Sequence, residues 1–483
     1  MKVDLKKFNI VSLIFLLIFL LAGFLRFYNL GYSNYQGDEI KAFYNPTGNQ
    51  NFYEFIFDQR KGPLQFLVTL AIKPFSDDYF NHSVMRLPFA LAGFVSIILF
   101  YLVVKNFYNQ KIALYATIFF ATSGFLVAFS RIVQYQSFVI LFGLVSIFLG
   151  QKFIESKKYL FVYLSIFSLA LSLLFHYDGV FFGVALAFLY LKELYFERKN
   201  KKIWINFIVS GILLISILAS FYVPLVLNLD NASLEYFRER IEGVGGDNKI
   251  SSSLFNFNLY QPYFSLYAYI IFGILGLFSF IKNYKNYTSL TIILWFMVAF
   301  IFMETLIQSP GTHIYTYLIP LMIILGVGVD FCIKVFKNKI LNYLSISIFI
   351  ILTTHLFLQS YVLFVENSTE YPWQEKKIYY FDLKRLTQAD NRNYYLSIFG
   401  FPYNRNWMEI REFLKDYNGE YDSSEKNSIA SFYLQNMRFK NNSKTYVEIE
   451  FPQSFSRANR RDYTPLKTIE NPNGTKSLIY FLN

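Results

Sequence analysis

The stretch IWINFIVSGILLISILASFYVPLVL, residues 203–227, runs for 25 residues without a charged side chain. A helix crosses the ~30 Å hydrocarbon core of a bilayer in roughly 20 residues, because each residue adds ~1.5 Å. Similar apolar runs recur from Asn9 to about Phe364, and the mean hydropathy of the chain is +0.32. Because backbone groups in lipid must satisfy one another, each run is predicted to be a helix. The sequence therefore predicts an α-helical polytopic membrane protein.

About eleven membrane-spanning helices are predicted from these runs. They lie near residues 9–27, 84–104, 112–130, 134–151, 159–175, 179–196, 203–227, 264–281, 288–307, 313–333 and 340–364. The first follows Met1–Lys7, which resembles a secretion signal, but no small-residue cleavage site comes after it, so we interpret it as an uncleaved span. The apolar segment Gly62–Phe75 is too short to cross the membrane, and Lys73 and Pro74 interrupt it near its end. We therefore expect it to lie in the interface on the extracytoplasmic side of the membrane.

The basic residues orient these helices. Of the 28 Lys and Arg residues before Glu366, 18 lie in the amino-terminal segment and in the connections on the same side of the membrane. The turns 176–178 and 308–312 on the opposite side hold none. Because Lys and Arg collect in short cytoplasmic loops, the amino terminus is predicted to be cytoplasmic and the membrane to be the cell inner (plasma) membrane. The net charge of +12 is thus interpreted as membrane topology and not as nucleic-acid binding.

The composition changes after residue 365, which divides the chain into two predicted domains. Residues 1–365 form the transmembrane domain, with a long outer loop at 28–84 and a second outer loop at 228–262. The second loop contains a polar helix candidate at 233–242 and a Gly-rich break at 243–246, which fits either a mobile lid or a linker. Residues 366–483 alternate strand-like and helix-like segments, at 394–399, 406–417, 445–451 and 477–481. They are predicted to form a small α/β domain, which an odd number of spans places outside the cell.

Charged side chains on the predicted outer side are candidates for chemistry. Asp38 and Glu39 follow the first span closely, and such acids can act as a general base or as ligands of a metal or of sugar hydroxyls. The alternative is a solvated acidic pair at the start of a short helix. Arg60 and Lys61 precede Pro63, and cations at the hydrocarbon edge suit a lipid phosphate. The alternative there is ordinary snorkelling at the interface.

Further ionisable residues are placed on the same side. They are Arg131 after the third span, His176 and Asp178 between the fifth and sixth, Glu304 near the end of the ninth, and His313 at the start of the tenth. Ionisable groups at membrane depth are costly and usually face a cavity or a partner, so their convergence predicts a substrate cavity. The four histidines and single cysteine show no metal-ligand spacing, so no metal site is predicted from them.

The order of these motifs is specific. Asp38-Glu39 on a short outer segment precedes Lys61-x-Pro-Leu, then Arg86-Leu-Pro at the start of a span, then Ala-Thr-Ser-Gly-Phe at 121–125 and Ser-Arg at 130–131. This order resembles the GT-C membrane glycosyltransferases of the protein O-mannosyltransferase, aminoarabinose-transferase and rhizobial lipopolysaccharide-transferase type. The resemblance covers roughly Leu21–Gly179, about a third of the chain. Tyr317-Leu-Ile-Pro-Leu is similar to a later span start of the family, and the outer α/β tail resembles the aminoarabinose-transferase layout.

The resemblance implies a GT-C type fold and a glycosyltransferase. Such an enzyme moves a sugar from a polyprenyl-phosphate donor to a lipid, glycan or protein acceptor at the extracytoplasmic membrane face, with inversion at the anomeric carbon. It implies Asp38 as the general base on the acceptor hydroxyl and Lys61 as the ligand of the donor phosphate. We add Glu39 to the catalytic pair, and Arg60 and Arg131 to the phosphate site.

Two departures from the family concern a metal. Arg60 stands where some members have Glu, and Gln136 stands where many have Asp; in the aminoarabinose transferase these two acids belong to a metal site. We therefore prefer a metal-independent mechanism in which Arg60 and Arg131 add positive charge. No cofactor is predicted, and a bound divalent metal is the alternative left open. His176, Asp178, Glu304 and His313 are assigned to the substrate cavity by position alone.

Two other classes of function compete with the transferase. A flippase or exporter of lipid-linked sugars predicts internal repeats and broken helices that meet at the membrane midplane, and the sequence shows no such repeat. An O-antigen-type polymerase or ligase predicts arginine-rich later outer loops. Arg238 and Arg240 fit that pattern weakly, and the Asp-Glu loop after the first span is then unexplained. We therefore prefer the transferase.

Overall fold

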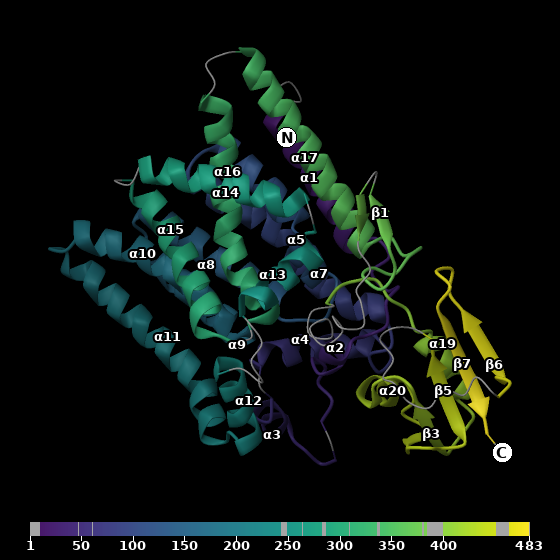
Figure 1. Cartoon of the computed structure of the whole chain (residues 1–483). Coiled ribbons are helices and arrows are strands. Elements are labelled where there is room, and N and C mark those ends of the chain that lie inside the picture. The colour runs from purple at the N-terminus through teal and green to yellow at the C-terminus, as the bar shows by residue number, and fades with distance from the viewer. Residues whose placement is uncertain are drawn as a thin grey trace, which may run out of the picture.

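The computed structural model places a helical body beside a small sheet (Figure 1). It describes residues 10–46, 48–59, 61–242, 249–262, 264–282, 286–308, 310–335, 339–378, 381–383, 399–450 and 463–482. The carboxy-terminal strands, yellow in Figure 1, lie at one end of the helical body, next to the short helices that follow the first long helix. The predicted helical membrane protein with a small carboxy-terminal α/β part is confirmed.

Eight helices in the described residues are long and apolar enough to cross a membrane, or nine if one bent pair is counted as a single span. They belong to α5 (His82–Phe107), α8 (Gln136–Ser156), α10 (Val180–Phe196), α11 (Lys201–Leu227), α14 (Phe264–Lys282), α15 (Tyr287–Ile301), α16 (Tyr315–Val335) and α17 (Lys339–Phe364). Two further predicted spans coincide with the shorter helices α1 (Ile10–Phe27) and α9 (Leu160–Phe175). Every predicted span is therefore a helix, and the total of eleven crossings stays a prediction.

The predicted span 112–130 is not one straight helix. It consists of α6 (Gln110–Thr122) and α7 (Gly124–Ser130), bent by 59° at Ser123, whose extended backbone ends one helix and begins the next. Gly124 allows this bend to pack closely, because a Cβ there would lie 1.9 Å from the carbonyl oxygen of Tyr260. Tyr260 is the last residue of α13 (Lys249–Tyr260), a helix that the sequence did not predict. The bend directs the residues after Ser130 toward the outer loop.

The outer loop 28–84 folds into short helices. They are α2 (Gly37–Ile40), α3 (Phe52–Phe57), α4 (Leu64–Ile72) and the 3-10 turn η2 (Lys73–Phe75). The predicted interfacial segment coincides with α4 and η2, which are apolar but too short to span, and α4 packs against α5 and α9. The predicted polar helix of the second outer loop is α12 (Asn231–Glu242). The Gly-rich break at 243–246 lies outside the described residues.

The carboxy-terminal part has two sheets. A hairpin pairs β1 (Lys376–Ile378) with β2 (Phe381–Leu383), and a mixed five-stranded sheet has the order β4-β3-β5-β7-β6. Its strands are β3 (Glu420–Ser423), β4 (Arg438–Phe439), β5 (Thr445–Ile449), β6 (Lys467–Glu470) and β7 (Lys476–Phe481). Helix α19 (Trp407–Leu414) precedes β3, and α20 (Asn427–Tyr433) connects β3 to β4. The predicted segments 406–417, 445–451 and 477–481 coincide with α19, β5 and β7. Most of the predicted strand 394–399 lies outside the described residues.

Buried contacts dock this sheet on the outer loop. The Tyr433 hydroxyl accepts a hydrogen bond from the backbone N–H of Tyr35 at 2.8 Å and lies 2.9 Å from Nε2 of His82. Within the tail, a bidentate ion pair joins Arg405 to Glu370, at 2.9 and 2.6 Å, with both side chains buried. The backbone N–H of Arg405 in turn donates to Oδ1 of Asn34 in the outer loop at 2.5 Å. Burial raises the pKa of Glu370, and Arg405 opposes that shift. The tail is therefore packed against the loop that carries Asp38 and Glu39.

Candidate active site

Asp38 and Glu39 are neighbours on α2, but their carboxylates lie in different surroundings. Gln36 caps this helix together with Glu39 in a capping box. The side chain of Glu39 is 1% exposed, whereas that of Asp38 is 46% exposed, with Lys41 Nζ at 4.0 Å from its Oδ1. Successive helical residues point ~100° apart, so one carboxylate can face the protein while the next faces outward. Only Asp38 of the two is open to a substrate.

Glu39 is held from several directions. Its Oε1 accepts from Nε of Arg86 at 2.9 Å and from the backbone N–H of Val133 at 3.0 Å. Its Oε2 accepts from Nη2 of Arg86 at 2.9 Å and from the backbone N–H of Gln36 at 3.2 Å. A carboxylate has about four acceptor positions, and all are used here. Arg86 also donates to the carbonyls of Leu30, Ser33 and Asn34. The ion pair therefore holds the beginning of the outer loop against α5.

Lys61 reaches the same place from the other end of the loop. Its Nζ donates to Oε1 of Gln134 at 3.2 Å, and Nε2 of Gln134 donates to the backbone carbonyl of Asp38 at 2.5 Å. Gly62 brings this segment close to α9, because a Cβ at Gly62 would lie 1.9 Å from the carbonyl oxygen of Leu174. Asp38 and Lys61 are thus joined through one amide group. Arg60 lies outside the described residues.

Arg131 is buried behind this arrangement. Its Nη1 donates to the carbonyls of Leu25 at 2.8 Å and Tyr28 at 3.0 Å, and its Nη2 donates to that of Asn29 at 3.3 Å. These carbonyls lie at and just beyond the carboxyl end of α1, where the helix dipole favours a cation. Burial lowers the pKa of Arg131, with the charge of Arg86 adding to the effect. The guanidinium therefore holds the end of α1 in place.

A small cavity lies between the outer loop and the tail. It separates the Glu39–Arg86 ion pair and Arg131 from the tail segment around Tyr403. Its lining residues are Leu30, Ser33, Asn34, Gln36, Glu39, Arg86, Arg131, Ile132, Gly400, Phe401 and Tyr403. The buried ion pair thus faces this interior space, and the Asp38 carboxylate is not part of its lining.

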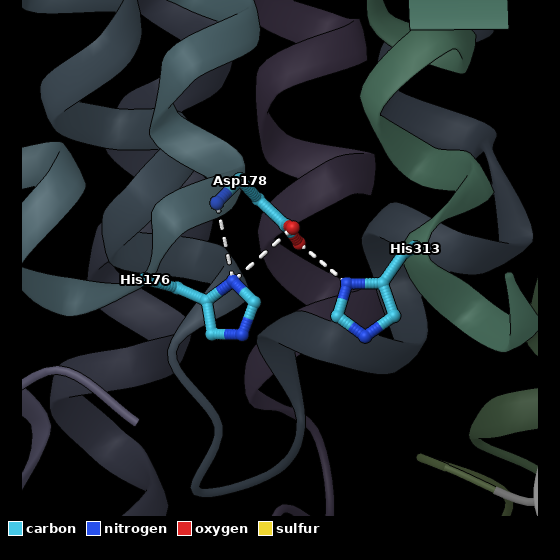
Figure 2. A group of neighbouring side chains, drawn as sticks. All are labelled: His176, Asp178 and His313. Atoms are coloured by element: carbon cyan, nitrogen blue, oxygen red, sulfur yellow. Dashed lines mark hydrogen bonds and ion pairs between the residues drawn. The ribbon is translucent and has the colours of Figure 1, made fainter. Parts of the chain in front are cut away.

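Three candidate residues come together beside α9 and α16. His176 immediately precedes the 3-10 turn η3 (Tyr177–Gly179), which contains Asp178, and His313 lies in the 3-10 turn η5 (Gly311–Ile314). Nδ1 of His313 lies 2.7 Å from Oδ2 of Asp178, and Nδ1 of His176 lies 3.2 Å from Oδ1 (Figure 2). The hydroxyl of Tyr315 donates to the same Oδ2 at 2.9 Å. One potential ligand atom from each of the three residues lies within 4.8 Å of the others, and all three side chains are buried.

This group adjoins Lys61 through an aromatic ring. The rings of Tyr135 and His176 stack with centroids 3.9 Å apart and planes 4° apart, and Nζ of Lys61 lies 5.5 Å from the centre of the Tyr135 ring. Burial lowers the pKa of His176 to about 4, although Asp178 acts in the opposite direction. Its imidazole is therefore neutral at physiological pH and carries a lone pair.

Glu304 lies at the edge of this region. It belongs to a π-helical turn, η4 (Phe302–Leu306), at the end of α15, and its Oε1 accepts a hydrogen bond from the Tyr317 hydroxyl at 2.9 Å. Tyr317 follows Tyr315 by two residues on α16. Short π-helical segments often occur at functional sites.

Sequence reasoning missed three residues of this site. Gln134 and Tyr135 lie directly after the Ser-Arg motif at 130–131, and Tyr315 stands just before Tyr317-Leu-Ile-Pro-Leu. Their closeness to recognised motifs was the available signal. The His176–Asp178–His313 group had no such signal, because 135 residues separate Asp178 from His313. The expectation that the histidines form no group of metal-ligand type is therefore corrected by the fold.

Comparisons with known proteins agree on one type of structure. Residues 65–222 match the model of the family described as dolichyl-phosphate-mannose-protein mannosyltransferase. The chain is similar to the apo oligosaccharyltransferase of Archaeoglobus fulgidus, at 11% identity and a TM-score of 0.53, over 90% of this chain and 64% of that one. It thus spans less than two thirds of that enzyme. No curated protein sequence matches the chain.

Two ligand-bound structures are also similar. One is oligosaccharyltransferase AglB of Archaeoglobus fulgidus with an inhibitory peptide and a dolichol-phosphate, at 10% identity and a TM-score of 0.52, covering 92% of this chain and 70% of that one. The other is ArnT of Cupriavidus metallidurans bound to undecaprenyl phosphate, at 10% identity and a TM-score of 0.53, covering 97% of both chains. At these identities the likeness is one of fold.

Proposed function

We propose that this chain, which has the GT-C glycosyltransferase fold, transfers a sugar from a polyprenyl-phosphate donor to an acceptor hydroxyl at the extracytoplasmic face of the membrane. The similar AglB and ArnT structures hold dolichol-phosphate and undecaprenyl phosphate, which are both polyprenyl phosphates. The acceptor class is a lipid, a glycan or a protein. The membrane is the cell inner membrane, the amino terminus is cytoplasmic, and the boundary between a transmembrane and an extracytoplasmic domain falls near residue 366.

One observation carries this proposal. The Gln134 amide is bonded to Lys61 Nζ on one side and to the Asp38 backbone on the other. This link between a half-exposed acid and a cation of the outer loop supports the proposal that both act on one substrate. These are the two charges that the reaction needs, since a base must take a proton from the acceptor and a cation must bind the donor phosphate.

The proposed reaction is an inverting displacement. The acceptor oxygen attacks the anomeric carbon while its proton passes to the Asp38 carboxylate. The bond from that carbon to the phosphate oxygen breaks, and the electron pair leaves with the polyprenyl phosphate, whose charge Lys61 stabilises. Phosphate is a good leaving group, so a second carboxylic acid is not needed to protonate it. This leaves Glu39 free for its structural role with Arg86.

The remaining predicted residues receive supporting roles. We assign Glu39 and Arg131 to positioning, because their hydrogen bonds go to Arg86 and to backbone groups of the loop. Glu304, which accepts from the Tyr317 hydroxyl, is proposed to line the substrate cavity, as its position in the sequence predicted. Arg60 is proposed to add positive charge beside Lys61.

The polymerase or ligase alternative has little structural support. Arg238, one of the two arginines that favoured it, is exposed on α12 and pairs with Glu242 of the same helix at 2.8 Å. An exposed pair of this type contributes little energy and does not form a preorganised anion site. The transferase is therefore the function that we prefer.

The direct test is a transfer assay in membranes with a radiolabelled polyprenyl-phosphate sugar. The native chain is expected to form labelled product, and Asp38→Asn is expected to lower turnover by about 10²–10⁴-fold, the usual contribution of a general base. Asp78→Asn is the matched control, because Asp78 is an exposed acid of the same loop that pairs with Lys73. Retained turnover in Asp38→Asn would remove Asp38 from catalysis.

The proposed orientation has its own test. Cys332 is the single cysteine, so Cys332→Ser gives a background without thiols, and Asn45 is an exposed residue of the outer loop. In that background, Asn45→Cys should react on intact cells with a maleimide that cannot cross the membrane. Reaction only after the cells are opened would place the loop, and with it Asp38, on the cytoplasmic side.

A further inference from the structure

The sugar transfer proposed above leaves the His176–Asp178–His313 group without a role. From its geometry we infer that these three side chains bind a divalent transition-metal ion of the Zn²⁺ type. Two imidazoles and one carboxylate are a ligand set that such ions favour, and three protein ligands leave a coordination position open. The inference concerns ion binding and does not depend on the proposed transferase activity.

The strongest evidence is a close contact between two electron-rich atoms. The backbone N–H of Asp178 donates to Nδ1 of His176 at 3.2 Å, so this nitrogen carries a lone pair. Oδ1 of Asp178 lies 3.2 Å from the same nitrogen, is buried, and has no hydrogen-bond partner among the described residues. Two acceptors that face each other in a buried place repel, and an unpaired buried acceptor is costly. A cation between them removes both penalties.

The spacing fits an ion of this size. Bonds of ~2.0–2.1 Å to a tetrahedral ion place neighbouring ligand atoms about 3.3 Å apart. The contact between His176 Nδ1 and Asp178 Oδ1 is 3.2 Å, and the ligand atoms of all three residues lie within 4.8 Å of one another. A small shift of His313 toward the other two ligands completes the set. Any proton on its Nδ1 is released when the ion binds, as metal ligation by histidine requires.

Neighbouring groups already fix the orientation of the ligands. The Tyr315 hydroxyl donates to Oδ2 of Asp178, and the Tyr135 ring stacks on that of His176. Outer partners of this kind hold metal ligands in place before the ion arrives. Figure 2 shows the Asp178 carboxylate between the two imidazole rings, with Nδ1 of both rings turned toward it.

A hydrogen-bonded histidine–aspartate–histidine group without an ion is the competing interpretation. It accounts for Oδ2 of Asp178, which receives Tyr315 and lies 2.7 Å from His313. It accounts for Oδ1 only where Nδ1 of His176 carries the proton, and in that tautomer the backbone N–H of Asp178 loses Nδ1 as its acceptor. For the transferase, an ion here would add positive charge near Lys61, since the Tyr135 ring adjoins both His176 and Lys61. This consequence alone rests on the proposed function.

Metal analysis of the full-length protein in detergent tests the inference. The purified chain is stripped with a chelator, dialysed against Zn²⁺, and analysed by elemental mass spectrometry. The native chain is expected to retain about one ion. Asp178→Asn and His313→Gln are expected to bind Zn²⁺ on the order of 100-fold more weakly, because loss of a ligand should cost at least as much affinity as loss of a group that only hydrogen-bonds a ligand. His355→Gln is the matched control, because His355 lies on α17 outside this group.

A second readout covers variants that fold poorly. Co²⁺ bound to the native chain should give visible absorption typical of nitrogen and oxygen ligands, and His176→Gln should shift that spectrum. Asp38→Asn should lose transfer activity and keep the ion, so failure of the proposed function and failure of ion binding are distinguishable. An absence of ion in the folded native chain, or equal binding by the native chain and by Asp178→Asn, would overturn the inference.

Discussion

Two adjacent carboxylates on one short helix serve different purposes in this molecule. We call Asp38, Gln134 and Lys61 the open group, and Glu39 with Arg86 the buried pair. In the open group the acid is half exposed, and its ion-pair contact with Lys41 is long, at 4.0 Å. In the buried pair both side chains are 1% exposed and are joined by two bonds of 2.9 Å. A difference of one residue in sequence separates a group available to substrate from one that fixes the backbone.

This contrast shows how the outer loop can be both precise and reactive. A catalytic base must be held within a fraction of an ångström and still keep a free carboxylate. Here Glu39 fixes the position of α2, because it bonds to Arg86 on α5 and to the backbone N–H of Val133. The position of Asp38 is then fixed by its neighbour, and among the described residues its carboxylate makes only the 4.0 Å contact with Lys41.

The largest expected effect comes from breaking the buried pair. Glu39→Gln leaves Arg86 buried without its partner, which is expected to cost about 3–5 kcal/mol of stability. Thermal unfolding of the purified protein in detergent checks this, and Asp38→Asn is the control that should unfold with the native midpoint. Equal midpoints for Glu39→Gln and the native chain would show that the pair does not hold the loop.

The second prediction concerns a substitution that displaces Lys61 without changing any charge of the open group. In Gly62→Ala the new Cβ would lie 1.9 Å from the carbonyl oxygen of Leu174, so the backbone that carries Lys61 must shift. Displacement of a reacting group by ~1 Å can cost about 100-fold in rate, and we expect a loss of that order in transfer. Gly211→Ala is the control, because a Cβ there meets no atom within 4 Å. Native activity in Gly62→Ala would mean that Lys61 need not be held there.

The third prediction removes the cation of the open group. Lys61→Ala loses a charge-assisted bond worth about 1.5–3 kcal/mol, so the KM for the polyprenyl-phosphate donor should rise roughly 10- to 150-fold. The KM for the acceptor should change little. Lys73→Ala provides the comparison, since Lys73 lies at the interface on the same loop but pairs with Asp78. Equal changes for donor and acceptor would argue against a phosphate contact.

The smallest expected effect belongs to the bridging amide. Gln134→Ala removes neutral hydrogen bonds worth about 0.5–1.5 kcal/mol, so kcat/KM should fall roughly two- to tenfold without a change in unfolding midpoint. Gln136→Ala is the neighbouring amide for comparison, because Gln136 begins α8 two residues beyond Gln134. A loss in Gln134→Ala as large as that in Lys61→Ala would mean that Gln134 itself contacts substrate.

The open group was largely predictable from the sequence. Asp38 and Lys61 stand in a motif order that indicates an outer loop, and the apolar periodicity indicates the helices on both sides of it. The division between Asp38 and Glu39 was not predictable, because the partner of Glu39 is Arg86, 47 residues later, and only the fold shows that it is buried. Local sequence identifies the acidic pair but not the surroundings of each member.

Long-range packing explains the other differences. The bend at Ser123 depends on the close approach of Gly124 to Tyr260, which lies on a helix that the polar character of residues 249–260 did not predict. The His176–Asp178–His313 group depends on two short turns that precede different spans. Hydrophobic periodicity places each span in the membrane, but it does not determine which turns meet on one side.

A double-mutant cycle tests most directly whether Asp38 and Lys61 work in one site. The kcat/KM of transfer is measured for the native chain, Asp38→Asn, Lys61→Ala and the double variant. If both side chains act on one transition state, the double loss should be smaller than the product of the single losses, with a coupling of about 1 kcal/mol or more. Losses that multiply to within about 0.5 kcal/mol would contradict a shared site.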